Sequence, residues 1–71
     1  MLLKDAKIGR AYTVKSIHLP FQLERRLEAL GMTRGTSVAV LNSKSQGVLI
    51  IKVRGTRFAL GRNIIKNILV R

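Results

Sequence analysis

The sequence predicts a small, mainly β domain, a strongly bent barrel of about five strands with one short α-helix inserted after the first long strand. Three observations lead to this fold class. Short apolar segments alternate with polar residues at a period of two, as in strands that face a core on one side. Glycine-containing turns separate these segments at hairpin spacing. A single segment, residues 20–31, has apolar residues at helical spacing instead.

Residues 1–10 are expected to lead into the first strand, with a turn at Gly9. This segment supplies apolar side chains that can pack at the edge of the hydrophobic core: Leu2, Leu3 and Ile8. The first strand is predicted over residues 11–19. Its apolar positions change phase after Val14, and a β-bulge near Ser16 would produce such a shift of one residue.

The helix is predicted over residues 20–31. Four leucines form one narrow apolar stripe along it: Leu19, Leu23, Leu27 and Leu30. Pro20 suits the first turn, and Gly31 suits the left-handed position just after a helix. Met32 can then fold back on Leu27, as in a Schellman ending. The stripe needs a sheet to pack on, because about three turns of helix are marginal alone in water.

The remaining strands are predicted over residues 37–42, 48–54, 57–60 and 68–70. Residues 42–47 form a polar loop, and residues 55–56 are the length of a tight hairpin turn. Residues 61–67 are long enough for one helical turn before the last strand. Residues 48–51 are apolar on both faces, which indicates a strand covered on two sides. Together these elements fit a barrel of the SH3-like type, built as one domain over residues 1–71.

Charge is the strongest signal in the composition. The chain has 14 Lys and Arg residues against 3 acids, a net charge of +11. This excess predicts attraction to nucleic acid, to an anionic membrane face or to an acidic protein surface. The absence of cysteine excludes disulfides and thiolate metal sites and agrees with a reducing cytoplasm. With 46% hydrophobic residues in so short a chain, some apolar surface is expected to remain outside and to mark a partner or a homo-oligomer.

Residues for catalysis or metal binding are scarce. The single histidine, His18, is expected in a loop, and Glu24 and Glu28 are expected to face away from the leucine stripe. Ferrous iron prefers clustered imidazole, carboxylate or thiolate ligands, so we predict no metal site. No Ser/His/Asp or Cys/His set and no phosphate-cradling glycine loop can be assembled. We therefore expect neither enzymatic activity nor a cofactor.

Six arginines are the candidate partner-binding residues: Arg25 and Arg26 on the helix, Arg34 in the turn after it, Arg54 and Arg57 around the hairpin, and Arg62 beyond it. Two helix glutamates cannot neutralise them, so as a set they are expected to bind something acidic, although solvated charge explains any single one equally well. The chain has few aromatic residues for base stacking: Tyr12, Phe21 and Phe58. This scarcity favours a protein partner over nucleic acid.

Two blocks of the sequence resemble the FeoA family. Residues 23–36, LERRLEALGMTRGT, are similar to the family's helix and turn, where an arginine-bearing helix ends in Leu-Gly and a second glycine follows four residues later. Residues 53–62, VRGTRFALGR, are similar to its second block, a Val-Arg-Gly hairpin followed by Ala-Leu and a basic residue. The likeness covers nearly the whole chain and departs from the family's pattern in the segments at residues 18–21 and 43–47.

The resemblance implies a small cytoplasmic accessory protein of bacterial ferrous iron uptake with an SH3-like fold. Such a protein acts by protein–protein interaction on the cytoplasmic GTP-binding part of the membrane transporter FeoB, and any GTP hydrolysis belongs to that partner. It can also sit under the inner face of the cell membrane, where each basic residue contributes about 1 kcal/mol. Two alternatives stay open: a small basic barrel that binds RNA or DNA through the phosphate backbone, and self-association that hides apolar surface.

Overall fold

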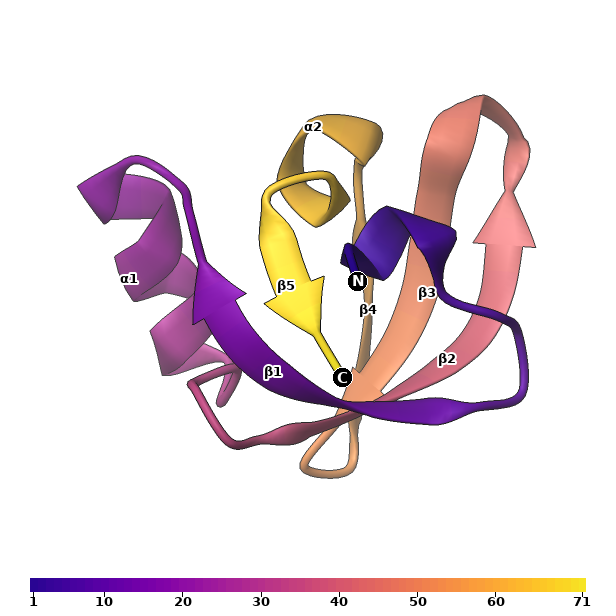
Figure 1. Cartoon of the computed structure of the whole chain (residues 1–71), viewed down its shortest axis with the longest axis horizontal. Helices are drawn as coiled ribbons and strands as arrows, with labels where there is room; N and C mark the ends of the chain where they lie inside the picture. The colour runs from indigo at the N-terminus through magenta and orange to yellow at the C-terminus, as the bar shows by residue number, and fades with distance from the viewer.

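Five antiparallel strands form one sheet that curls into a small barrel in the computed structural model, which describes residues 1–71 (Figure 1). The spatial order of the strands is β4-β3-β2-β1-β5. The strands are β1 (Ala11–Ile17), β2 (Ser37–Lys44), β3 (Val48–Val53), β4 (Thr56–Leu60) and β5 (Ile68–Val70). The helices are α1 (Phe21–Ala29) and the single turn α2 (Arg62–Ile65), and short 3-10 turns lie at Leu3–Asp5 and Ser45–Gly47. The predicted fold class and element order are confirmed.

β1 pairs with two different neighbours along its length. Residues 11–13 pair with β2, and residues 14–17 pair with β5. The register shifts between Val14 and Ser16, which leaves Lys15 as an extra residue on β1. This irregularity is the bulge predicted near Ser16. Because a bulge bends its strand and increases the local twist, it lets β1 turn from one neighbour to the other.

Two strand boundaries differ from the prediction. β1 stops at Ile17, short of residue 19, because the chain approaches Pro20, which has no N–H to donate to a ladder. The β3–β4 turn consists of Arg54 and Gly55, one residue earlier than predicted, with φ of 51° and 84°. Two positive φ angles are typical of a type I′ turn, and Gly55 occupies its second central position at little cost.

β2 is longer than predicted. It continues past residue 42 to Lys44, which pairs with Val48 of β3. The register shifts between Val40 and Asn42, so this strand also has a bulge, which the sequence analysis did not predict. The polar loop is thereby reduced to the 3-10 turn at Ser45–Gly47. The bulge bends β2 over the barrel and lets pairing with β3 extend to the end of the strand.

The core is a single cluster of 13 buried hydrophobic side chains. All five strands, α1, α2 and the N-terminal turn contribute to it: Leu3, Val14, Leu27, Met32, Val38, Val40, Leu49, Ile51, Val53, Leu60, Ile65, Ile68 and Val70. On β3, Leu49, Ile51 and Val53 alternate with more exposed neighbours. The interior is aliphatic apart from Met32, and no buried side-chain N or O atom lacks a hydrogen-bond partner.

The N-terminal segment belongs to the barrel. Leu3 is fully buried, and the Met1 amino group donates a 3.0 Å hydrogen bond to the carbonyl of Val70. The Val70 N–H donates to the Met1 carbonyl at 2.8 Å, so the segment covers the outer edge of β5. The expectation that Ile8 fills the core is wrong, since 55% of Ile8 is exposed. It precedes Gly9, whose φ of 87° turns the chain into β1 and leaves Ile8 outside.

α1 ends as the sequence predicts. Gly31 has a φ of 95°, and its N–H donates to the carbonyl of Glu28 at 2.9 Å. The Met32 N–H donates to the carbonyl of Leu27, also at 2.9 Å. These are the two hydrogen bonds of a Schellman motif. Met32 and Leu27 are both buried, so the helix ending is also the point at which α1 enters the core.

The leucine stripe of α1 is covered only in part. Leu27 is buried and Leu19 and Leu23 are half-buried, but Leu30 is 44% exposed and Phe21, on the first turn, is 69% exposed. α1 lies at one side of the barrel, beyond the end of β1 (Figure 1). Part of the surplus apolar surface expected from the composition is therefore found at this helix, and the rest lies at Met1, Ile8 and Leu41. Neither α1 nor α2 combines the length and hydropathy of a membrane-spanning helix.

Leu3→Ala is expected to lower the free energy of unfolding by about 2–5 kcal/mol, because it leaves a cavity under a fully buried side chain. In a domain of this size, such a loss is comparable to the whole stability. Ile8→Ala is the matched control and is expected to change it by about 0.5 kcal/mol or less. Urea unfolding followed by circular dichroism measures both, and equal effects would show that the N-terminal segment does not pack as described.

Candidate functional site

The turn between α1 and β2 is tied firmly to β1. The Gly35 N–H donates to the carbonyl of Val14 at 2.8 Å, and the Val14 N–H donates to the carbonyl of Thr36 at 2.9 Å. Within the turn, the hydroxyls of Thr33 and Thr36 lie 2.9 Å apart, within hydrogen-bond distance. These bonds hold the backbone on both sides of Arg34, so the turn places the Arg34 side chain beside the bulge of β1.

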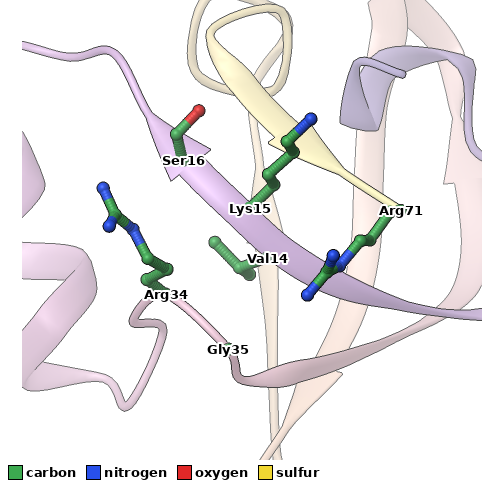
Figure 2. Close-up of a pocket in the computed structure, with 6 residues that line it drawn as sticks. All are labelled: Val14, Lys15, Ser16, Arg34, Gly35 and Arg71. Atoms are coloured by element: carbon green, nitrogen blue, oxygen red, sulfur yellow. The ribbon is translucent and has the colours of Figure 1, made fainter.

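A cleft of about 620 Å³ opens between this turn, β1 and the end of β5. We call it the basic cleft, and six residues line it: Val14, Lys15, Ser16, Arg34, Gly35 and Arg71. Figure 2 shows Arg34 and Arg71 on either side of Val14, with Lys15 projecting from β1, so that the three cationic groups stand at three corners. The lining contains no acidic residue. The cleft can therefore attract an anion from solution.

A second, smaller cleft of about 240 Å³ lies between β1 and α1. We call it the acidic cleft, and it is lined by Ser16, Ile17, His18, Glu24, Glu28, Thr33 and Arg34. It shares Ser16 and Arg34 with the basic cleft. The two glutamates thus face the end of β1 and lie near His18, a proximity that the sequence analysis did not predict.

The acidic cleft is poorly equipped for catalysis or metal binding. The Ser16 hydroxyl and His18 Nε2 are 2.9 Å apart, but both side chains are exposed at this contact and no carboxylate is hydrogen-bonded to the imidazole. A Ser–His pair needs such an orienting group and an oxyanion site to act as a nucleophile. No three His, Cys, Asp or Glu side chains gather closely enough to hold a metal ion.

Arg34 is the only predicted arginine that lines a cleft. Arg25 stacks over Phe21, with its guanidinium carbon 5.4 Å from the ring centroid. Arg54 Nε donates a 3.1 Å hydrogen bond to the carbonyl of Gly31, which joins the β3–β4 turn to the end of α1. The Arg62 side chain packs against Gly47, in the turn between β2 and β3. Figure 1 shows α2 and the β3–β4 turn at opposite ends of the barrel.

Arg26 and Arg57 are exposed. The single ion pair in the chain joins Lys4 to Asp5, so none of the six predicted arginines is paired with a carboxylate. The six do not gather in one cleft. They spread from α1 across the β3–β4 turn to α2, and all six are exposed.

Sequence reasoning missed two cations of the basic cleft, Lys15 and Arg71. Lys15 occupies the bulge of β1, and Arg71 follows β5, where its backbone exchanges hydrogen bonds of 3.0 and 2.8 Å with Thr13. The bulge was a usable signal, because bulges often re-aim a side chain. That Arg71 lines the same cleft as Arg34 was not predictable, since it depends on how β1 pairs with β5.

The barrel and its clefts define a small, basic SH3-like domain. Within that class, the chain belongs to the FeoA domain family, whose model matches residues 1–71. No curated protein matches the sequence.

Three solved structures illustrate the similarity. The crystal structure of an iron uptake regulatory protein, FeoA, is 31% identical with a TM-score of 0.89, and the alignment covers 100% of this chain and 95% of that one. The solution structure of FeoA from Chlorobium tepidum is 29% identical with a TM-score of 0.93, covering 100% and 69%. The crystal structure of Stenotrophomonas maltophilia FeoA complexed with zinc, described as a prokaryotic SH3 domain protein, is 29% identical with a TM-score of 0.83, covering 100% and 89%.

The link between the β3–β4 turn and α1 can be tested at Gly31. A Cβ at Gly31 would lie 2.7 Å from Arg54 Cδ, whereas a Cβ at Gly35, with a similar positive φ, meets nothing within 4 Å. Both Gly→Ala variants are expected to lose about 1 kcal/mol from the strained backbone, and Gly31→Ala is expected to lose more, because Arg54 must move. In an Arg54→Ala background this difference is expected to vanish. Chemical denaturation of the four variants measures it, and a persisting difference would contradict the contact.

Proposed function

We propose that this protein is a small cytoplasmic accessory factor of bacterial ferrous iron uptake, and that it binds the cytoplasmic GTP-binding domain of a FeoB-type membrane transporter. The observation that carries the proposal is the match of the FeoA domain model to residues 1–71. The S. maltophilia relative is described as a candidate ferrous iron transport activating factor. In this proposal the protein acts by binding its partner, and the partner carries out GTP hydrolysis.

Electrostatics supports a docking role. A net charge of +11 with one exposed ion pair leaves most cations unneutralised by the chain itself. Such a surface accelerates encounter with an acidic protein and disfavours basic competitors. The same charge would hold the protein near the anionic inner face of the membrane, where the transporter lies.

Exposed apolar groups on α1 supply a second element of the interface. Phe21 is 69% exposed and Leu30 is 44% exposed, and Arg25 stacks on the Phe21 ring. Aromatic and arginine side chains carry a disproportionate share of binding energy at protein interfaces. We therefore place the centre of the docking surface on α1 and Arg34, with the other predicted arginines, Arg26, Arg54, Arg57 and Arg62, contributing mainly to steering.

Charge reversal tests this proposal. Arg25→Glu and Arg34→Glu are each expected to weaken binding to the purified cytoplasmic GTP-binding domain of FeoB from the same organism by about tenfold, and raising the salt concentration is expected to weaken binding further. Lys44→Glu, which changes the same charge at the far end of β2, is the control and is expected to have an effect of about twofold or less. Isothermal titration calorimetry measures all three.

Two results would contradict the proposal. One is the absence of binding between the native protein and the transporter domain. The other is tighter binding to random-sequence RNA than to that domain, measured by gel shift at two ionic strengths, which would instead support recognition of a phosphate backbone.

A further inference from the structure

The backbone of the basic cleft is fixed on every side. Arg71 is held by its two hydrogen bonds to Thr13, and Gly35 by its hydrogen bond to Val14. Lys15 sits in the bulge where β1 changes partner. The three cationic side chains thus start from backbone positions that are already ordered. A site of this kind loses little entropy in its framework when a ligand binds.

The charged side chains that line the basic cleft are all cationic. Lys15, Arg34 and Arg71 line it together, no acidic residue does, and the chain's one ion pair lies elsewhere. Guanidinium groups bind carboxylates through two parallel hydrogen bonds, and an ammonium group adds a point charge. A ligand with two neighbouring carboxylates would suit this arrangement, because Lys15, Arg34 and Arg71 line one cleft and no acidic side chain lines it with them.

The lining also limits what the ligand can be. It has no aromatic side chain on which a base could stack, and its one apolar residue, Val14, is buried. On the α1 side the basic cleft continues into the acidic cleft through Ser16 and Arg34. Glu24 and Glu28, one helical turn apart, line that continuation and form no ion pair.

We infer that the basic cleft is an acceptor site for the carboxylates of an acidic protein segment, and that the glutamates of α1 keep polyanions out of it. A nucleic acid carries a phosphate at every step of its backbone, so a strand that entered the cleft would press further phosphates against Glu24 and Glu28. A membrane surface is a plane of anionic headgroups, so it would meet the same repulsion from Glu24 and Glu28. A protein segment can place acidic side chains at Arg34 and neutral or basic ones beyond it. The inference rests on the proposed function for the identity of the partner, but the chemistry of the cleft is independent of that identity.

The test uses defined probes and the full chain labelled with 15N. The first probe is the acetylated, amidated tetrapeptide Gly-Glu-Glu-Gly, with Gly-Gln-Gln-Gly as its uncharged control. We expect the glutamyl peptide to shift the backbone amide signals of Ser16, Gly35 and Arg71 in a saturable manner, and the glutaminyl peptide to leave them unmoved.

Arg34→Ala is expected to weaken peptide binding about fivefold, whereas Arg57→Ala, which removes the same charge from β4, is expected to change it less than twofold. Circular dichroism establishes that both variants are folded.

The second probe tests the role of the glutamates. The native protein is titrated with a 20-nucleotide single-stranded RNA and with vesicles that contain phosphatidylglycerol. In the double variant Glu24→Gln, Glu28→Gln, RNA binding through the basic cleft is expected to strengthen about tenfold, while binding of the glutamyl peptide changes less than twofold. Stronger RNA binding that shifts amide signals over the whole surface equally would contradict the inference, because any loss of negative charge would produce it.

The inference is overturned if Arg34→Ala and Arg57→Ala weaken peptide binding equally, since the attraction would then belong to the net charge. It is also overturned if RNA or vesicles shift the amide signals of the basic cleft of the native protein at lower concentrations than the peptide does. The transporter domain takes no part in these titrations. Cleft binding without transporter binding would therefore remove only the proposed function, and transporter binding without cleft binding would remove only this inference.

Discussion

The rest of the structure depends on one constraint, which is that β1 must pair with two neighbours in succession. A chain of 71 residues has too little material for a second layer over its sheet, so the sheet covers itself by bending. The bulge at Lys15 is where β1 leaves β2 and joins β5. This exchange brings the C-terminal strand and the turn after α1 to the same place on β1. The basic cleft is thus a direct product of the way the barrel bends.

Burial and charge divide the molecule into two parts. The 13 core residues are aliphatic apart from Met32, and most of them lie on the five strands. The cations lie outside, with one ion pair among them. Because mutual repulsion among surface cations opposes compaction, the core must hold the barrel together against its own charge. An acidic partner would relieve that repulsion, so binding it would also stabilise the folded barrel.

Much of the fold could be predicted from local patterns, because the features concerned are local. The Schellman ending needs only Gly31 and Met32, and the bulge follows from the change of phase in β1. The second bulge in β2 was missed because its polar end, after Leu41, is typical of a loop. Ile8 was misplaced because apolar character does not distinguish a core residue from an exposed one beside a turn. Of the basic cleft, only Arg34 was identified, since Lys15 and Arg71 acquire their role through strand pairing.

The position of α1 has a consequence for motion. Its single buried side chain is Leu27, whereas β3 buries three of its six residues. A segment with so little buried apolar area can open without the rest of the chain unfolding, so the amides of α1 are expected to exchange with solvent hydrogen well before those of β2 and β3. The helix that carries Phe21 and Arg25 is thus expected to open more readily than β2 and β3. Such local opening would let α1 change its angle against a partner's surface while the barrel stays folded.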